Sequence, residues 1–105
     1  MPMIRLSVMY PRPGKFDFDY YAQTHMQLCH KLLDAFGLIE SEVNKGVEDS
    51  PYIAIGHLVF NSLEEMQKGL QAHDPTLGAD LPNFTDIKPQ FQVSEIVDRK
   101  SISRT

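Results

Sequence analysis

Apolar and polar residues alternate along three stretches of the chain, and this period of two is typical of β-strands. Residues 3–10 and 90–97 both show it, and residues 38–47 show it with a more polar second face. The apolar face of the first stretch consists of Ile4, Leu6, Val8 and Tyr10. The apolar face of residues 38–47 is expected to comprise Ile39, Val43 and Val47.

A fourth apolar stretch, YIAIGHLVF at residues 52–60, has apolar side chains on both of its faces. Strands with this composition are usually covered on both sides. We therefore predict that residues 52–60 form a central strand of the sheet.

Residues 17–37 carry the clearest helical pattern, because their apolar side chains recur at spacings of three and four. Asp17 can accept hydrogen bonds from the first free amides, and Gly37 can adopt the left-handed conformation that ends a helix. His25 lies on the apolar stripe, so its imidazole is expected to face inward. The other members of the stripe are Phe18, Tyr21, Ala22, Leu28, Cys29, Leu32, Leu33 and Phe36.

Ser62 and Glu65 have the spacing of a capping box and predict the start of a second, shorter helix. Asp74 and Pro75 mark its expected end, since a proline removes a helical hydrogen bond. Residues 76–89 have no consistent period and are predicted to form an ordered loop. The stripe of this helix comprises Leu63, Met66, Leu70 and His73.

The predicted order is strand, helix, strand, strand, helix, strand. This is the βαββαβ plan of the α+β ferredoxin-like folds, in which an antiparallel four-stranded sheet carries both helices on one face. A chain of 105 residues fits one domain. We place that domain at residues 1–98 and a polar C-terminal tail at residues 99–105.

The opposite face of such a sheet has no helix to cover it. One of the two apolar sets of the central strand, either Tyr52, Ala54, Leu58 and Phe60 or Ile53, Ile55 and Val59, lies on that face, and the chain has no third layer to shield it. An exposed apolar face normally marks an interface. We therefore predict a homodimer in which the two sheets cover each other.

The chain has 14 acidic and 10 basic side chains, a formal net charge of -4. Nucleic acids and anionic membranes attract clustered Lys and Arg, so this charge argues against both as partners. No apolar stretch approaches the length of a membrane span, and the N-terminus lacks the pattern of a secretion signal. We therefore expect a cytoplasmic protein. Cys29, the single cysteine, fits a small buried apolar position.

The inward histidine, His25, has two interpretations. Its ring can be a core side chain with hydrogen-bonded nitrogens, or it can face a cavity and move protons near neutral pH. Tyr21 lies four residues earlier on the same stripe, so a phenol and an imidazole can point into one cavity. In that case His25 would be the general acid or base and Tyr21 its hydrogen-bonding partner. The alternative for Tyr21 is an ordinary core residue.

Motifs for metals, cofactors and activated nucleophiles were not found. The histidines have no recognised ligand spacing, since His25 and His30 would lie about 140° apart around a helix. The patterns of phosphate loops, dinucleotide-binding folds and nucleophilic serines are also missing. We therefore expect no metal and no cofactor.

Asp80 and Asn83 lie in the predicted loop before the last strand and could close over such a cavity. The alternative is turn chemistry, because Asp and Asn often hydrogen-bond to their own backbone in loops. The sequence leaves both open.

A motif in the first helix, Y-Y-x-x-T-H-M-Q-L, resembles the helix motif of the EthD family, and its residues are Tyr20, Tyr21, Thr24, His25 and Leu28. The likeness covers nearly the whole chain, including ADLPNFT at residues 79–85. The family belongs to the dimeric α+β barrels, with small antibiotic-biosynthesis monooxygenases, muconolactone isomerases and haem-degrading enzymes. Members often carry a proline where this chain has Gln27, which predicts a less perturbed helix here.

The resemblance implies a homodimer with a pocket between helices and sheet in each subunit. EthD is named for a role in degrading an ether alongside a cytochrome P450 system, which implies an accessory role in an oxidative pathway. We expect His25 and Tyr21 to be catalytic. The residues expected to contact substrate are Tyr20, Tyr10, His57, Asp80, Asn83 and Phe84.

Three functions follow as hypotheses. The first is a small catabolic or tailoring protein that performs acid–base chemistry on an apolar, oxygen-bearing organic compound. As an enzyme it would be a cofactor-independent oxidoreductase, isomerase or lyase. The second is a non-catalytic ligand-binding or stress-related dimer, and the third is a haem-binding protein that uses His25.

Overall fold

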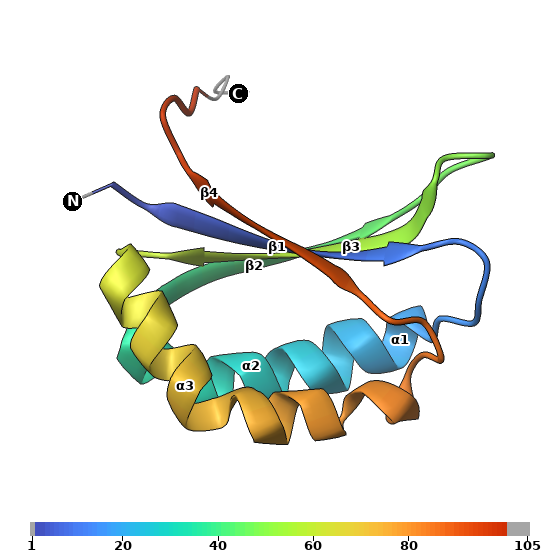
Figure 1. Cartoon of the computed structure of the whole chain (residues 1–105), viewed down its shortest axis with the longest axis horizontal. Helices are drawn as coiled ribbons and strands as arrows, with labels where there is room; N and C mark the ends of the chain where they lie inside the picture. Colours follow the sequence, from blue (N-terminus) through green and yellow to red (C-terminus); the bar gives the residue numbers. More distant parts are fainter. Residues whose placement is uncertain (1, 101–105) are drawn as a thin grey trace, which may run out of the picture.

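The computed structural model describes residues 2–100, which form one sheet and one layer of helices (Figure 1). The strands are β1 (Ile4–Pro11), β2 (Leu38–Lys45), β3 (Tyr52–Phe60) and β4 (Gln90–Glu95). The first helical segment runs through α1 (Phe18–Tyr20), η1 (Tyr21–His25), α2 (Met26–Leu33) and η2 (Asp34–Phe36). The second consists of α3 (Leu63–Ala79) and η3 (Leu81–Asn83).

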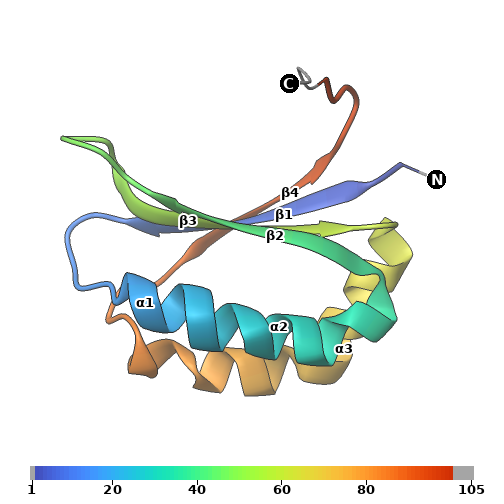
Figure 2. The ribbon, with the colours of Figure 1, turned by 180° about the vertical axis from the view of Figure 1, so that it is seen from behind.

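The sheet has the strand order β2-β3-β1-β4, and each neighbouring pair is antiparallel. Both helical segments lie on the same side of the sheet, as the two opposite views show (Figures 1 and 2). β3 is central, as its two apolar faces predicted. The α+β ferredoxin-like fold expected from the order of elements is therefore confirmed.

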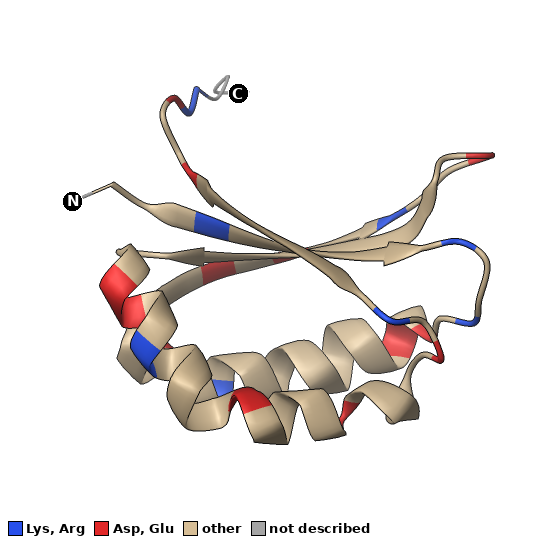
Figure 3. Cartoon of the chain, in the orientation of Figure 1, with Lys and Arg blue, Asp and Glu red and all other residues tan. Residues whose placement is uncertain are grey.

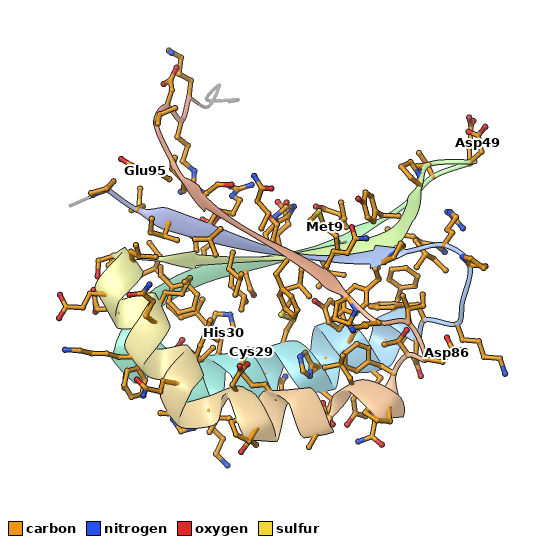
Figure 4. The ribbon with its side chains drawn as sticks, viewed as in Figure 1. Met9, Cys29, His30, Asp49, Asp86 and Glu95 are labelled. Atoms are coloured by element: carbon orange, nitrogen blue, oxygen red, sulfur yellow. The ribbon has the colours of Figure 1, made fainter. Side chains whose placement is uncertain are left out.

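The core lies between the helices and the sheet. Leu6 pairs with Leu58 and Tyr10 with Ala54 across β1 and β3, so all four point toward the helices. Side chains from both layers fill this space, and Cys29 lies among them (Figure 4). Burial raises the pKa of the Cys29 thiol to about 12, so it behaves as the small apolar side chain that the sequence predicts.

The first helical segment has the predicted ends but not the predicted regularity. Asp17 accepts a hydrogen bond from the Tyr20 amide at 3.0 Å, and Gly37 has φ 82°. Between them, Tyr21–His25 forms a π-helical turn in which the Met26 amide donates to the Tyr21 carbonyl. Gln27 lies beyond this turn, in the regular helix α2. A π turn widens the helix by one residue and is common at functional sites.

The second helix continues beyond Pro75, so the predicted helix end at Asp74 and the predicted loop at residues 76–89 are partly wrong. α3 reaches Ala79, and η3 begins at Leu81, after the single turn residue Asp80. Leu77 is buried against the core, and this packing favours the helix despite the hydrogen bond that Pro75 removes. The only irregular part of that range is the shorter stretch after η3.

The predicted apolar face of residues 38–47 is also corrected. A register shift lies between Leu38 and Glu40, so Ile39 falls at a bulge and is 49% exposed. Leu38 takes the buried position instead. A bulge adds one residue to a strand and reverses the side chains on either side of it, which simple alternation does not reveal.

The chain after β4 leaves the sheet on the side that carries no helices (Figure 1). β4 ends at Glu95, two residues before the predicted end. Arg99 forms an ion pair with Glu40 of β2, so the predicted tail at residues 99–105 begins with a contact to the sheet. The part of the tail at residues 101–105 lies outside the described residues.

Charged side chains are distributed over the whole fold. In Figure 3 the Lys and Arg segments lie apart from one another on the sheet, the loops and the helices. Within residues 2–100, no helix has both the length and the apolar character needed to cross a membrane.

Candidate active site

His25 is held in the layer between helices and sheet by the π-helical turn. It is 6% exposed, and its ring stacks on Tyr21 with centroids 5.4 Å apart and an interplanar angle of 13°. Phe84 packs against the ring as well, at 4.7 Å between centroids. The Asp17 amide donates to the Phe84 carbonyl at 2.8 Å, so the start of the helix and the end of η3 hold the ring from two sides.

The Nδ1 atom of His25 lies 2.9 Å from Oδ2 of Asp80. A carboxylate can only accept a hydrogen bond, so Nδ1 carries the proton in this contact and Nε2 of the neutral ring is the basic nitrogen. No described residue provides a hydrogen-bond partner for Nε2. Every fully buried side-chain nitrogen or oxygen among the described residues has a hydrogen-bond partner. Because Nε2 has no such partner, it is not fully buried and keeps some exposed surface.

Asp80 lies between α3 and η3 and is held by two further donors. The Tyr20 hydroxyl donates to Oδ1 at 2.6 Å, and the Asn83 amide donates to the same oxygen at 2.9 Å. Burial alone would raise the pKa of Asp80, but the hydrogen bonds from Tyr20, Asn83 and His25 outweigh it and lower the pKa. The carboxylate is therefore ionised at neutral pH and fixes the His25 tautomer.

A cavity of about 140 Å³ lies beside His25, between the sheet and the helices. Its walls are mainly apolar side chains of β1, β3, α2 and α3. Asp74 and Gly78 of α3 and Phe91 of β4 are exposed to solvent and line it too, so it opens between α3 and β4. Its other lining residues are Leu6, Val8, Tyr10, Tyr21, Met26, Cys29, Leu58, Leu70, Leu77, Leu81 and Pro89.

A wider hollow of about 750 Å³ lies near Lys15, Lys45 and Asp86. It is an open surface depression with side chains of both charges, and His25 does not line it. The smaller cavity is therefore the better candidate site, because an apolar enclosure with few converging polar groups is typical of a small-molecule site.

Tyr21 lines the cavity but does not have the expected contact with His25. The two rings stack, and the hydrogen-bond partner of His25 is Asp80 instead. The Tyr21 hydroxyl lies over Gly56 of β3, where a Cβ atom would be 1.9 Å away from it. Burial raises the pKa of Tyr10 to about 12 and that of Tyr21 still further, so both phenols stay protonated.

His57 lies away from this site. It pairs with Ser7 across β1 and β3, and its Nδ1 is 2.9 Å from the Ser7 hydroxyl. Both side chains are on the face opposite the helices, so His57, which was expected to contact substrate, does not line this cavity. Burial lowers the pKa of His57, and the charge of Arg5 lowers it further.

The structure brings together most of the residues that the sequence suggested. Tyr10 and Tyr21 line the cavity with His25, while Tyr20, Asp80 and Asn83 form a hydrogen-bonded group behind the ring. The lining residues of α3 beyond Pro75 were missed. Their spacing contains the signal, because Leu70, Asp74, Leu77 and Leu81 continue the helical period of three and four across the proline.

The described residues contain no group of three or more His, Cys, Asp or Glu side chains placed to hold a metal ion. The cavity is also below the range of about 300–1,000 Å³ that is typical of sites for drug-sized ligands. A haem needs more space than this cavity of about 140 Å³ provides and does not fit it.

Comparison with known families gives a match to the EthD domain over residues 15–88. No curated protein matches the chain. An EthD-like protein of known structure from Ralstonia eutropha JMP134 is similar along almost its whole length. The two share 28% identity with a TM-score of 0.85, over 96% of this chain and 97% of that protein.

Two further solved structures share the fold at lower identity. One is a mutant of SnoaB, a cofactor-independent oxygenase from Streptomyces nogalater, with 6% identity and a TM-score of 0.67 over 99% of this chain and all of the other. The other is a dimeric ferredoxin-like protein from an uncultured marine organism. It has 17% identity and a TM-score of 0.61, over 98% of this chain and 95% of that protein.

Proposed function

Because this chain belongs to the EthD family, we propose that it acts on small organic molecules as a catabolic or tailoring protein, with His25 as its general acid or base. The compound is apolar and bears an oxygen, and the role is that of an accessory to an oxidative pathway. The description of SnoaB as a cofactor-independent oxygenase supports chemistry of this kind on the same fold.

The observation that carries the proposal is the pairing of His25 with Asp80 beside an apolar cavity. Nε2 is free to take a proton from a bound molecule, and the Asp80 carboxylate stabilises the imidazolium that results. The proton then returns to another atom of the same molecule, or leaves with solvent. Few waters compete for Nε2 in an apolar enclosure, which favours transfer to and from the ligand.

Tyr21 has a positioning role in this scheme. Its ring stacks on the imidazole, and its protonated hydroxyl is turned toward the sheet. Tyr20 and Asn83 position the ring through Asp80, since each donates a hydrogen bond to that carboxylate. Removal of either donor is expected to weaken the acid–base function less than removal of His25.

The test begins with a ligand that co-purifies with the protein and is identified by mass spectrometry. His25→Gln should lower its turnover by about 10²–10⁴-fold, the usual contribution of a general acid or base. His30→Gln is the matched control, because His30 lies on the same helical segment but bonds to Asp34 and Ser41 away from the cavity. Full activity of His25→Gln would refute the proposal. Recovery of the ligand unchanged by wild-type protein would instead favour the non-catalytic, ligand-binding function.

We also propose that the working unit is a homodimer formed through the face opposite the helices. Met9, Ile53 and Ile55 are only half-buried there, and Ser7 and His57 form a polar pair between them. The dimeric state of the related ferredoxin-like protein supports this arrangement. An interface of standard size removes about 800 Å² from each partner.

Sedimentation equilibrium tests the dimer. The wild-type protein should sediment as a dimer at micromolar concentration, and Ile55→Asp should shift it toward the 12.0 kDa monomer by placing a charge on the open face. Leu63→Asp is the control, because Leu63 is an exposed apolar residue on α3, away from that face. A soluble wild-type monomer would contradict the proposed assembly.

A further inference from the structure

We propose that the cavity beside His25 seats one neutral, hydroxyl-bearing ring of about the size of benzene, whose hydroxyl donates a hydrogen bond to Nε2 of His25. The ligand class is therefore a phenol or a closely similar cyclic compound. This inference rests on the proposed function, because it takes the cavity as the place where the substrate reacts.

The size of the ring follows from the volume of the cavity. It encloses about 140 Å³, and an apolar protein cavity of about 150 Å³ is known to hold benzene. Leu6 and Leu58 of the sheet face Leu70 and Leu77 of α3 across this space, so the ring would have aliphatic contacts on both sides. A fused second ring would extend past the mouth between α3 and β4.

The hydroxyl group follows from the polar atoms in the wall. Nε2 of His25 is an acceptor without a described partner, and it belongs to the ring whose Nδ1 lies 2.9 Å from the ionised Asp80. The hydroxyls of Tyr10 and Tyr21 interact with each other, so they compete less with Nε2 of His25 for the hydroxyl of a ligand. A ligand O–H that points at Nε2 satisfies this acceptor, whereas the Asp74 carboxylate lies at the solvent-exposed mouth.

The neutral charge follows from the charged groups near the cavity. No Lys or Arg belongs to the described lining, whereas Asp74 lies at the mouth and Asp80 lies behind His25. A carboxylate ligand would enter an apolar space without a cationic partner and next to two negative charges, which is costly. Phenol avoids this cost, because it is protonated at neutral pH.

Titration calorimetry at neutral pH with phenol, benzoate and 2-naphthol tests the proposal. Phenol should bind at least about tenfold more tightly than benzoate, and 2-naphthol more weakly than phenol despite its larger apolar surface. Phenol should also shift the imidazole NMR signals of His25.

Leu70→Ala enlarges the cavity and should invert the order of affinity for phenol and 2-naphthol. Leu32→Ala removes a similar side chain of α2 outside the lining and should leave the order unchanged.

Asp74→Asn tests the charge argument separately. It should strengthen benzoate binding about two- to fivefold relative to phenol binding, since Asp74 is exposed and its field is screened. Benzoate binding as tight as phenol, or 2-naphthol binding tighter, would overturn the inference. These readouts need no turnover, so phenol binding together with a fully active His25→Gln variant would refute the proposed function and leave the ligand class standing.

Discussion

Asp80 and His25 are separated by 55 residues in the chain, yet their side chains meet at 2.9 Å between Oδ2 and Nδ1. One comes from the junction of α3 and η3 and the other from the π-helical turn. Their contact joins the two helical segments at the end of the layer nearest the cavity. The same contact fixes which nitrogen of His25 is available to a ligand.

The stability of the protein should fall in acid through Asp80. Its pKa is lowered in the folded protein, so its contribution is present above the ordinary value of 3.8 and is lost as the pH falls through the folded-state pKa. At pH 6, Asp80→Asn should reduce the free energy of unfolding by on the order of 1–2 kcal/mol, because it breaks hydrogen bonds to a charged group. Below pH 3 the difference from wild type should shrink.

Denaturant unfolding at the two pH values measures this effect. Asp49→Asn provides the control, since Asp49 projects from the tip of the turn between β2 and β3 (Figure 4). The difference in unfolding free energy between wild type and Asp49→Asn should not change with pH. A difference between wild type and Asp80→Asn that is as large below pH 3 as at pH 6 would count against the assignment.

Alkaline conditions should unfold the protein through its buried phenols. The pKa of Tyr10 is raised from 10.0 to about 12 and that of Tyr21 is raised further, so both favour the folded state fully below pH 10. Their contribution is lost as the pH rises through about 12, because only the unfolded chain ionises readily. The phenolate absorbance of these two tyrosines should therefore appear together with the loss of circular dichroism. Ionisation of all four tyrosines in a protein that remains folded would contradict this.

Gly56 should be one of the least replaceable positions in the sheet. A Cβ there would lie 1.9 Å from the Tyr21 hydroxyl and 3.0 Å from the Met26 side chain, and β3 is paired on both sides and cannot move aside. Gly56→Ala should cost about 1–3 kcal/mol of stability, as overpacked cores do. Tyr21→Phe in the same protein should recover part of that loss.

Gly78 provides the matched control for this substitution. A Cβ at Gly78 meets nothing within 4 Å, and the residue lies in an exposed part of α3. Gly78→Ala should therefore be neutral or stabilise the protein by up to about 1 kcal/mol, because alanine favours helix. If thermal unfolding shows equal effects at the two glycines, the packing argument at Gly56 is wrong.

The sequence was sufficient for the fold because its strands and helices each bury a face with a regular period. The stripe that contains Tyr21 and His25 and the two-sided apolar run at residues 52–60 determine the layers. The π turn at residues 21–25 was not predictable, since it depends on how the helix packs on the sheet. Pro75 was misinterpreted because a local rule does not include the tertiary packing of the helix beyond it, where Leu77 is buried.

The candidate site was only partly predictable for a related reason. The inward direction of His25 follows from helical spacing, but its contact with Asp80 depends on where a distant segment returns to the helix. Spacing also placed Tyr21 next to His25 and could not tell a stacked ring from a hydrogen bond. Likewise, it did not show that His57 points to the opposite face of the sheet.

The tautomer of His25 tests the account most directly, since the proposed acid–base function requires a free basic nitrogen at the cavity. Long-range ¹H–¹⁵N NMR of the imidazole, at a pH where the ring is neutral, distinguishes a protonated from an unprotonated ring nitrogen. We expect Nδ1 to carry the proton and Nε2 to be unprotonated, and Asp80→Asn to disturb that preference. A neutral His25 with its proton on Nε2 in the wild-type protein would contradict the account.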